Sequence, residues 1–198
     1  NIYNLDKVRK LSNKENTVYL VEGYMDVIGL TRNKIENVVA NLGTALTDKQ
    51  ISILNQYFDN IIVCFDGDAS GYNAAVRAAE NSIKDLQPNK NISFLFLPDG
   101  EDPDSFVNIK GKNFFLKYSK DNLITIYDFI YKNYKKNNDS TPSSLAVFEK
   151  NLRKSASSIK DSYVKKYVLE YFLDKISQLT PNLQKQKKKY YLKNLKSL

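Results

Sequence analysis

The chain has 198 residues, of which 42% are hydrophobic and 26% are charged, the composition of a globular protein with one large domain or two small ones. It contains no histidine and one cysteine, which excludes histidine-dependent catalysis and an intramolecular disulfide and makes a zinc site implausible. Any chemistry must therefore use carboxylates, metal ions, lysine, arginine or tyrosine.

The net charge of +8 is unevenly distributed. Residues 1–110 carry 11 basic and 15 acidic side chains, whereas residues 111–198 carry 19 and 7. The basic half is compatible with a polyanionic partner, although lysine is common throughout the chain. There is no visible signal peptide and no apolar run of membrane-spanning length, so we expect a cytoplasmic protein without a membrane partner. We also expect a monomer. Because the chain begins at Asn1 rather than methionine, we expect it to be part of a longer protein.

In the first half, short apolar runs alternate with helical patterns. Strands are predicted at Thr17–Val21, Val38–Leu42, Ile61–Phe65 and Ile92–Leu97. Helices are predicted at about Asn4–Lys14, Tyr24–Arg32, Thr47–Tyr57 and Ala69–Leu86. This alternation predicts an α/β domain with a mainly parallel sheet of about four strands and helices on both faces.

After about Gly111 the pattern becomes helical. Helices are predicted at Lys112–Ser119, Ile124–Tyr134, Ser143–Ser157, Ser162–Leu179 and Asn182–Lys196. Aromatic residues would supply the core of this part, and its tyrosines are also able to stack on nucleic-acid bases. The sequence therefore divides into an α/β domain over residues 1–110 and an all-α helical subdomain over residues 111–198.

Three pairs of acidic residues follow predicted strands. They are Glu22 and Asp26, Asp66 and Asp68, and Asp102 and Asp104. Because the carboxyl ends of parallel strands meet at one edge of a sheet, we expect these side chains to converge. Concentrated negative charge is unfavourable without a cation, and oxygen ligands suit Mg²⁺ or Mn²⁺.

Small and basic residues accompany these acids. Gly23, Gly67 and Gly71 would let a ligand approach the backbone closely, and the helix after Asp68 would offer amide donors to a phosphate. Arg77 either pairs with one of the acids or lies on the surface. Each acidic pair alone is also explained by helix capping or by compensation of a helix dipole, so only their combination indicates a site.

Four segments in order closely resemble the Toprim region of the bacterial DnaG primases. They are Val21–Val27, Leu42–Thr47, Phe65–Gly71 and Leu97–Phe106. The resemblance covers about Leu5–Phe106 and is weak over the helical remainder. It implies that Glu22, Asp66, Asp68, Asp102 and Asp104 hold two or more catalytic Mg²⁺ or Mn²⁺ ions. Asp26 is an associated acid, so that Glu22, Asp26, Asp66 and Asp68 form the catalytic set.

The resemblance also implies an activity and partners. The chain would be a catalytic-core fragment of a DNA-dependent RNA polymerase that makes short RNA primers from NTPs on a single-stranded DNA template, giving an RNA–DNA hybrid. A zinc module and a basic subdomain would lie upstream, and a domain that binds the replicative helicase downstream, so the fragment alone would be inactive or weakly active. A Toprim nuclease, a topoisomerase-like enzyme and a non-catalytic adaptor remain as alternatives.

Overall fold

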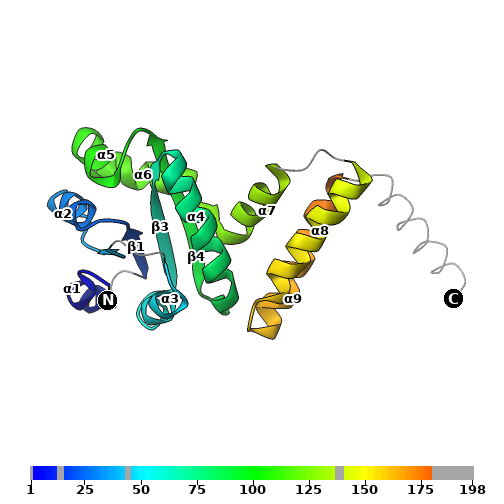
Figure 1. Ribbon diagram of the computed structural model, residues 1–198. Helices are drawn as coiled ribbons and strands as arrows, with labels where there is room; N and C mark the ends of the chain where they lie inside the picture. Colours follow the sequence, from blue (N-terminus) through cyan, green and yellow to red (C-terminus); the bar gives the residue numbers. More distant parts are fainter. Residues whose placement is uncertain (1, 13–15, 43–45, 137–140, 180–198) are drawn as a thin grey trace, which may run out of the picture.

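The computed structural model describes residues 2–12, 16–42, 46–136 and 141–179 (Figure 1). Its sheet has the strand order β2-β1-β3-β4-β5. The first four strands are parallel, and β5 is antiparallel to β4. The strands are β1 (Thr17–Val21), β2 (Val38–Ala40), β3 (Asn60–Gly67), β4 (Asn91–Asp99) and β5 (Ile124–Thr125).

Helices connect the parallel strands and form the second half of the chain. They are α1 (Leu5–Val8), η1 (Arg9–Leu11), α2 (Tyr24–Arg32), α3 (Asp48–Asn55), α4 (Ala69–Ser82), η2 (Ile83–Asp85), α5 (Pro103–Lys110), α6 (Lys112–Asn122), α7 (Ile126–Lys136), α8 (Pro142–Ser157) and α9 (Ser162–Leu179). Local signals fix several starts. The Thr47 hydroxyl accepts a hydrogen bond from the Gln50 amide at the start of α3, and Pro142 opens α8 after the cap Thr141.

Alternate residues of each strand face two separate cores. In β1, Val18 and Leu20 pack with α3, α4 and α7–α9, whereas Tyr19 and Val21 pack with α2, α5 and α6. The sheet is therefore buried on both faces, which explains why its strands are continuous apolar runs rather than alternating ones. Figure 1 shows α8 and α9 side by side, beyond α7 as seen from the sheet.

The predicted α/β fold followed by helices is confirmed, and several elements differ in their bounds. The sheet gains β5, because Ile124 and Thr125 pair with β4 instead of starting a helix. Strand β4 continues through Pro98, where the register with β3 shifts. A proline at this interruption costs no ladder hydrogen bond. The N-terminal helix ends as a short 3₁₀ segment at Leu11.

The domain boundary at residue 110 remains a prediction. Strand β5 lies after that boundary and extends the sheet, and α7–α9 share one hydrophobic core with it. The predicted helix Asn182–Lys196 lies outside the described residues. Within the described ranges, no helix is both long enough and apolar enough to cross a membrane.

Candidate metal-dependent active site

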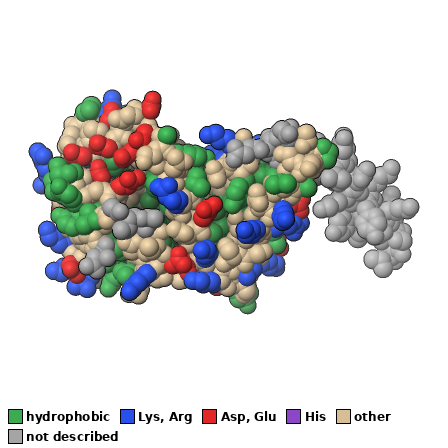
Figure 2. All heavy atoms as spheres, viewed as in Figure 1, with side chains coloured by type: hydrophobic (Ala, Val, Ile, Leu, Met, Phe, Trp, Pro, Cys, Tyr) green, Lys and Arg blue, Asp and Glu red, His purple; other side chains and the backbone are tan. Residues whose placement is uncertain are grey.

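The strand order creates a ligand-binding position between β1 and β3. From β1 the chain moves to β2 on one side and later to β3 on the other, so the direction of winding reverses between β1 and β3. In open α/β sheets, ligands bind outside the carboxyl ends of the strands at this switch point. Glu22 directly follows β1, and Asp66 lies near the end of β3. Figure 2 shows acidic side chains gathered around α5 and the adjoining strand ends.

The electrostatics show that acids from separate strand ends lie close together. Burial raises the pKa of Glu22, and the charges of Asp66, Asp26 and Asp68 raise it further. Burial also raises the pKa of Asp66, with added repulsion from Asp102 and Asp68. Residues from the ends of β1, β3 and β4 therefore act on one another, whereas a shared metal site at these acids stays a prediction.

Asp26 links α2 to the start of α5. Its Oδ2 accepts a hydrogen bond from the Gly23 amide at 3.0 Å, and the Asp104 backbone lies close enough to lower its pKa slightly. Burial, which outweighs these effects, raises the pKa of Asp26 to about 6. Asp26 therefore holds the turn after β1 against the acidic turn after β4.

Asp68 and Asp102 are the N-caps of α4 and α5. Asp68 Oδ1 accepts a hydrogen bond from the Gly71 amide at 2.7 Å. Asp102 Oδ1 accepts one from the Ser105 amide, also at 2.7 Å. Each cap fixes one carboxylate oxygen beside a helix N-terminus. The capping explanation of these acids and the metal-binding explanation are thus compatible, because a cap uses one oxygen of the two.

Asp104 is turned toward α2. Its Oδ1 accepts a hydrogen bond from the Asn108 side-chain amide at 2.7 Å, and a Cβ at Gly29 would lie 2.0 Å from that oxygen. Unlike Asp66, Asp68 and Asp26, it has no resolved effect on the pKa of Glu22. Its predicted role as a metal ligand stays a prediction.

Gly67 and Gly71 let backbone segments approach one another around Asp66, and Gly23 leaves room for the Asp26 carboxylate. A Cβ at Gly67 would lie 1.8 Å from the Pro98 carbonyl oxygen, and one at Gly71 would lie 2.3 Å from the Asp66 carbonyl oxygen. A Cβ at Gly23 would lie 3.2 Å from Asp26 Oδ2. These positions are explained by packing within the chain, and contact between the three glycines and a ligand stays a prediction.

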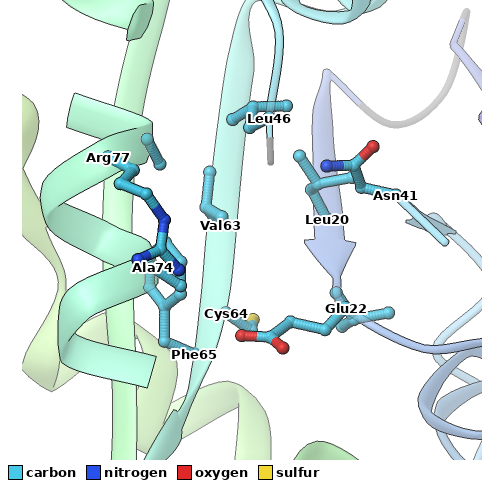
Figure 3. A pocket seen from close by; sticks show the side chains of 11 residues that line it. Leu20, Glu22, Asn41, Leu46, Val63, Cys64, Phe65, Ala74 and Arg77 are labelled. Carbon is cyan, nitrogen blue, oxygen red and sulfur yellow. The ribbon is translucent and has the colours of Figure 1, made fainter. Parts of the chain in front are cut away.

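A cavity of about 310 Å³ opens beside the acids, between β1, β3 and α4 (Figure 3). Its walls are mostly apolar, and its polar lining comes from Glu22, Asn41 and Arg77. The Arg77 guanidinium lies across the cavity from Glu22 and lowers the pKa of that carboxyl, which opposes the effects of burial and the other acids. Arg77 forms no hydrogen bond or ion pair with any residue that the structure describes.

The prediction from sequence missed Asn41. It is buried, directly follows β2 and lines this cavity, and its Oδ1 accepts a hydrogen bond from the Gln50 side chain. The sequence did contain a signal for Asn41, because it is a polar residue at the end of a buried apolar strand. Cys64 also lines the cavity, but it is a buried core residue, and burial raises the pKa of its thiol.

The acidic groups fit a divalent cation in their chemistry. None of the five ion pairs among the described residues involves any of these six acids, and Arg77 opposes the charge of Glu22 only weakly. All available donors are hard oxygen atoms, as Mg²⁺ and Mn²⁺ prefer. As they stand, no three acidic side chains in the described ranges lie close enough together to hold an ion. Binding would therefore require side-chain rotation.

Comparisons with known proteins agree with this geometry. Residues 19–107 match a family described as Toprim-like. A DNA primase of Rickettsia typhi is 38% identical over 197 residues, which is 99% of this chain and 32% of that protein. The crystal structure of a DNA primase domain from Pseudomonas aeruginosa has a TM-score of 0.83 and 31% identity, over 91% of this chain and 55% of that one.

Another similar structure is that of a DnaG primase catalytic domain bound to single-stranded DNA, with a TM-score of 0.81 and 30% identity. The match covers 87% of this chain and 56% of that one. Residues 19–107 of the chain therefore form a Toprim-like domain. It is homologous to the catalytic core of the DnaG DNA primases, a family that uses divalent metal ions. The chain spans about one third of the length of the curated primases that it matches.

Proposed function

We propose that this chain is the Toprim-containing part of a DNA primase core, which makes short RNA primers for DNA replication. The observation that carries the proposal is the convergence of carboxylates from three strand ends at one switch point, in a chain homologous to primases. In the reaction, a 3′-hydroxyl attacks the α-phosphate of an incoming NTP, the new phosphodiester bond forms, and pyrophosphate leaves.

Glu22, Asp66, Asp68, Asp102 and Asp104 are the proposed ligands of two or more Mg²⁺ or Mn²⁺ ions. When bound, such ions activate an attacking oxygen and neutralise the charge on a leaving group. The carboxylates fix where those charges are compensated, and the caps at Asp68 and Asp102 limit their movement before substrate arrives. Asp26 positions the turns that carry Glu22 and Asp102.

Arg77 is the proposed partner of the NTP phosphates. Its guanidinium has no ion pair within the described residues and lines the cavity beside Glu22. A guanidinium suits phosphate because it presents several donors in one plane. Gly23, Gly67 and Gly71 are proposed to give a nucleotide access to backbone amides near the N-terminus of α4.

The proposed partners are NTPs, a single-stranded DNA template and the RNA–DNA hybrid product. The solved DnaG catalytic domain with bound single-stranded DNA supports the template. We propose that the complete protein is a monomer acting in the cytoplasm at the replication fork, with a helicase-binding domain downstream. The segment alone would be inactive or weakly active, because holding the template at the acids would need the upstream subdomain.

The test is primer synthesis by the full-length primase that contains this segment, given a single-stranded template, NTPs and Mg²⁺. The Asp66→Asn and Asp68→Asn variants should lose synthesis while keeping the circular-dichroism spectrum of the wild type. New RNA supports the proposal, whereas shortening of the DNA would indicate a nuclease. Wild-type synthesis by either variant would refute the assignment of these acids.

A further inference from the structure

A second candidate site lies near the amino end of β4, whereas the acids lie at the carboxyl ends of the strands. A groove of about 480 Å³ runs between α9, the start of α7 and residues 86–91, which lead into β4. Strand β4 has nine residues, so the groove lies roughly 30 Å from the acidic turn at the other end of that strand. Tyr127, Tyr163, Tyr167 and Tyr171 line it.

The four tyrosines form a rigid floor and an exposed rim. Tyr127 and Tyr171 are half-buried and pack edge to face with their ring centroids 5.2 Å apart, and the Tyr171 hydroxyl donates to Asp128. Tyr163 and Tyr167 lie four residues apart on α9, so they share one helix face. Their exposed fractions are 72% and 62%, far above those of tyrosines that serve a core.

The charges around the groove suit an anionic ligand. Among the described residues, Lys90 is the only charged residue that lines it and is paired with Asp59, and Lys166 lies over the Tyr167 ring with its ammonium 5.2 Å from the ring centroid. Three nearby acids have partners, whereas Glu170 is an exposed acid one turn beyond Tyr167 on α9. Asp128 pairs with Lys175, Asp59 pairs with Lys90, and the Asp161 carboxylate accepts two backbone amides.

We propose that this tyrosine groove binds single-stranded DNA by stacking bases on Tyr163 and Tyr167. Exposed aromatic rings beside lysines are the arrangement by which proteins bind single strands without reading their sequence. The groove does not overlap the carboxylate edge, and the proposal rests on the proposed function only for the choice of DNA. A strand held there would be a second contact with the template, remote from the site of synthesis.

The experiment measures fluorescence anisotropy of fluorescein-labelled oligo(dT) of 12 nucleotides with the full 198-residue chain, in EDTA so that the acids hold no cation. Tyr163→Ala combined with Tyr167→Ala should weaken binding by at least about 20-fold, since stacking contributes about 1–3 kcal/mol per base. Replacing both residues by Phe should retain binding, because the ring and not the hydroxyl stacks. Replacing both by Leu should lose it.

Two controls separate this groove from other surfaces. Tyr3→Ala removes an exposed tyrosine outside the groove and should leave the affinity unchanged. The double Ala variant should keep the wild-type Mn²⁺ affinity in calorimetry, so a failed metal site and a failed groove give different results. The DNA proposal is overturned if the double Ala variant binds like the wild type, if Phe is as damaging as Ala, or if oligo(rU) binds more tightly than oligo(dT). It is also overturned if sedimentation shows that the double Ala variant has lost only self-association of the chain and has kept DNA binding.

Discussion

At the scale of single residues, the charged acids of the site destabilise the fold. Glu22, Asp26 and Asp66 all have raised pKa values, chiefly because burial disfavours their charged forms. A carboxyl with a higher pKa in the folded than in the unfolded chain binds more protons when folded. Its destabilising effect is therefore absent below the unfolded-state pKa and complete above the folded-state pKa.

Asp26 gives a pH-dependent prediction from this reasoning. Its pKa rises from 3.8 to about 6, so the metal-free wild-type chain should lose stability from this residue as the pH rises from about 4 to above 6. Asp26→Asn keeps a hydrogen-bond acceptor for the Gly23 amide but cannot ionise. We expect the variant to exceed the wild type by ~1 kcal/mol, or about 2–4 °C in Tm, at pH 7.5 and by little at pH 4. Thermal unfolding in EDTA at both pH values measures this, and a difference that shrinks as the pH rises would contradict it.

Asp68 allows its capping and metal-binding roles to be separated. Asn caps helices as well as Asp does, whereas Ala does not. We expect Asp68→Ala to lower the free energy of unfolding by about 1 kcal/mol through loss of the bond to the Gly71 amide. Asp68→Asn should cost much less, and both should weaken Mn²⁺ binding in calorimetry. Wild-type Mn²⁺ affinity in Asp68→Asn would show that the residue is only a cap.

At the scale of elements, close contact between the ends of β3 and β4 holds the site together. The Gly67 amide donates to the Glu101 carbonyl oxygen at 3.1 Å, and the Gly100 amide donates to the Gly67 carbonyl oxygen at 3.2 Å. The register shift between these strands lies beside Asp66. Such irregularities often lie next to active sites, where they redirect a side chain.

Gly67→Ala should damage this contact more than Gly23→Ala does. The added Cβ at Gly67 meets backbone at 1.8 Å, whereas at Gly23 the nearest atom is a side-chain oxygen at 3.2 Å. We expect a loss of about 1–3 kcal/mol for Gly67→Ala and a smaller loss for Gly23→Ala. Urea unfolding of the two variants provides the comparison, and an equal or reversed order would contradict the packing explanation.

At the scale of the whole molecule, the apolar runs predicted the four parallel strands because strands buried on both faces leave a strong signal. The strand ends then predicted where the acids would gather. The two-residue strand β5 could not be predicted, since Ile124 and Thr125 become a strand only through pairing with β4. Nor could the sequence show that Asp104 turns toward α2, because that direction depends on Asn108 and Gly29.

The shared core predicts that the two halves of the chain unfold together. Phe129 of α7 is buried against the rings of Phe94, Phe96 and Tyr72 from the α/β half. Phe129→Ala should therefore destabilise the chain by about 3–5 kcal/mol. Far-ultraviolet circular dichroism should still show one transition. Two separate transitions, with only the helical signal lost early, would show that the halves fold independently.

The most direct test of the account is a crystal of this chain soaked with Mn²⁺ and an NTP, measured for anomalous scattering. We predict Mn²⁺ peaks within coordination distance of Glu22, Asp66 and Asp102, with the triphosphate extending toward Arg77. An empty carboxylate edge at saturating Mn²⁺, or ions bound only elsewhere on the surface, would contradict the claim that three strand ends build one cation site.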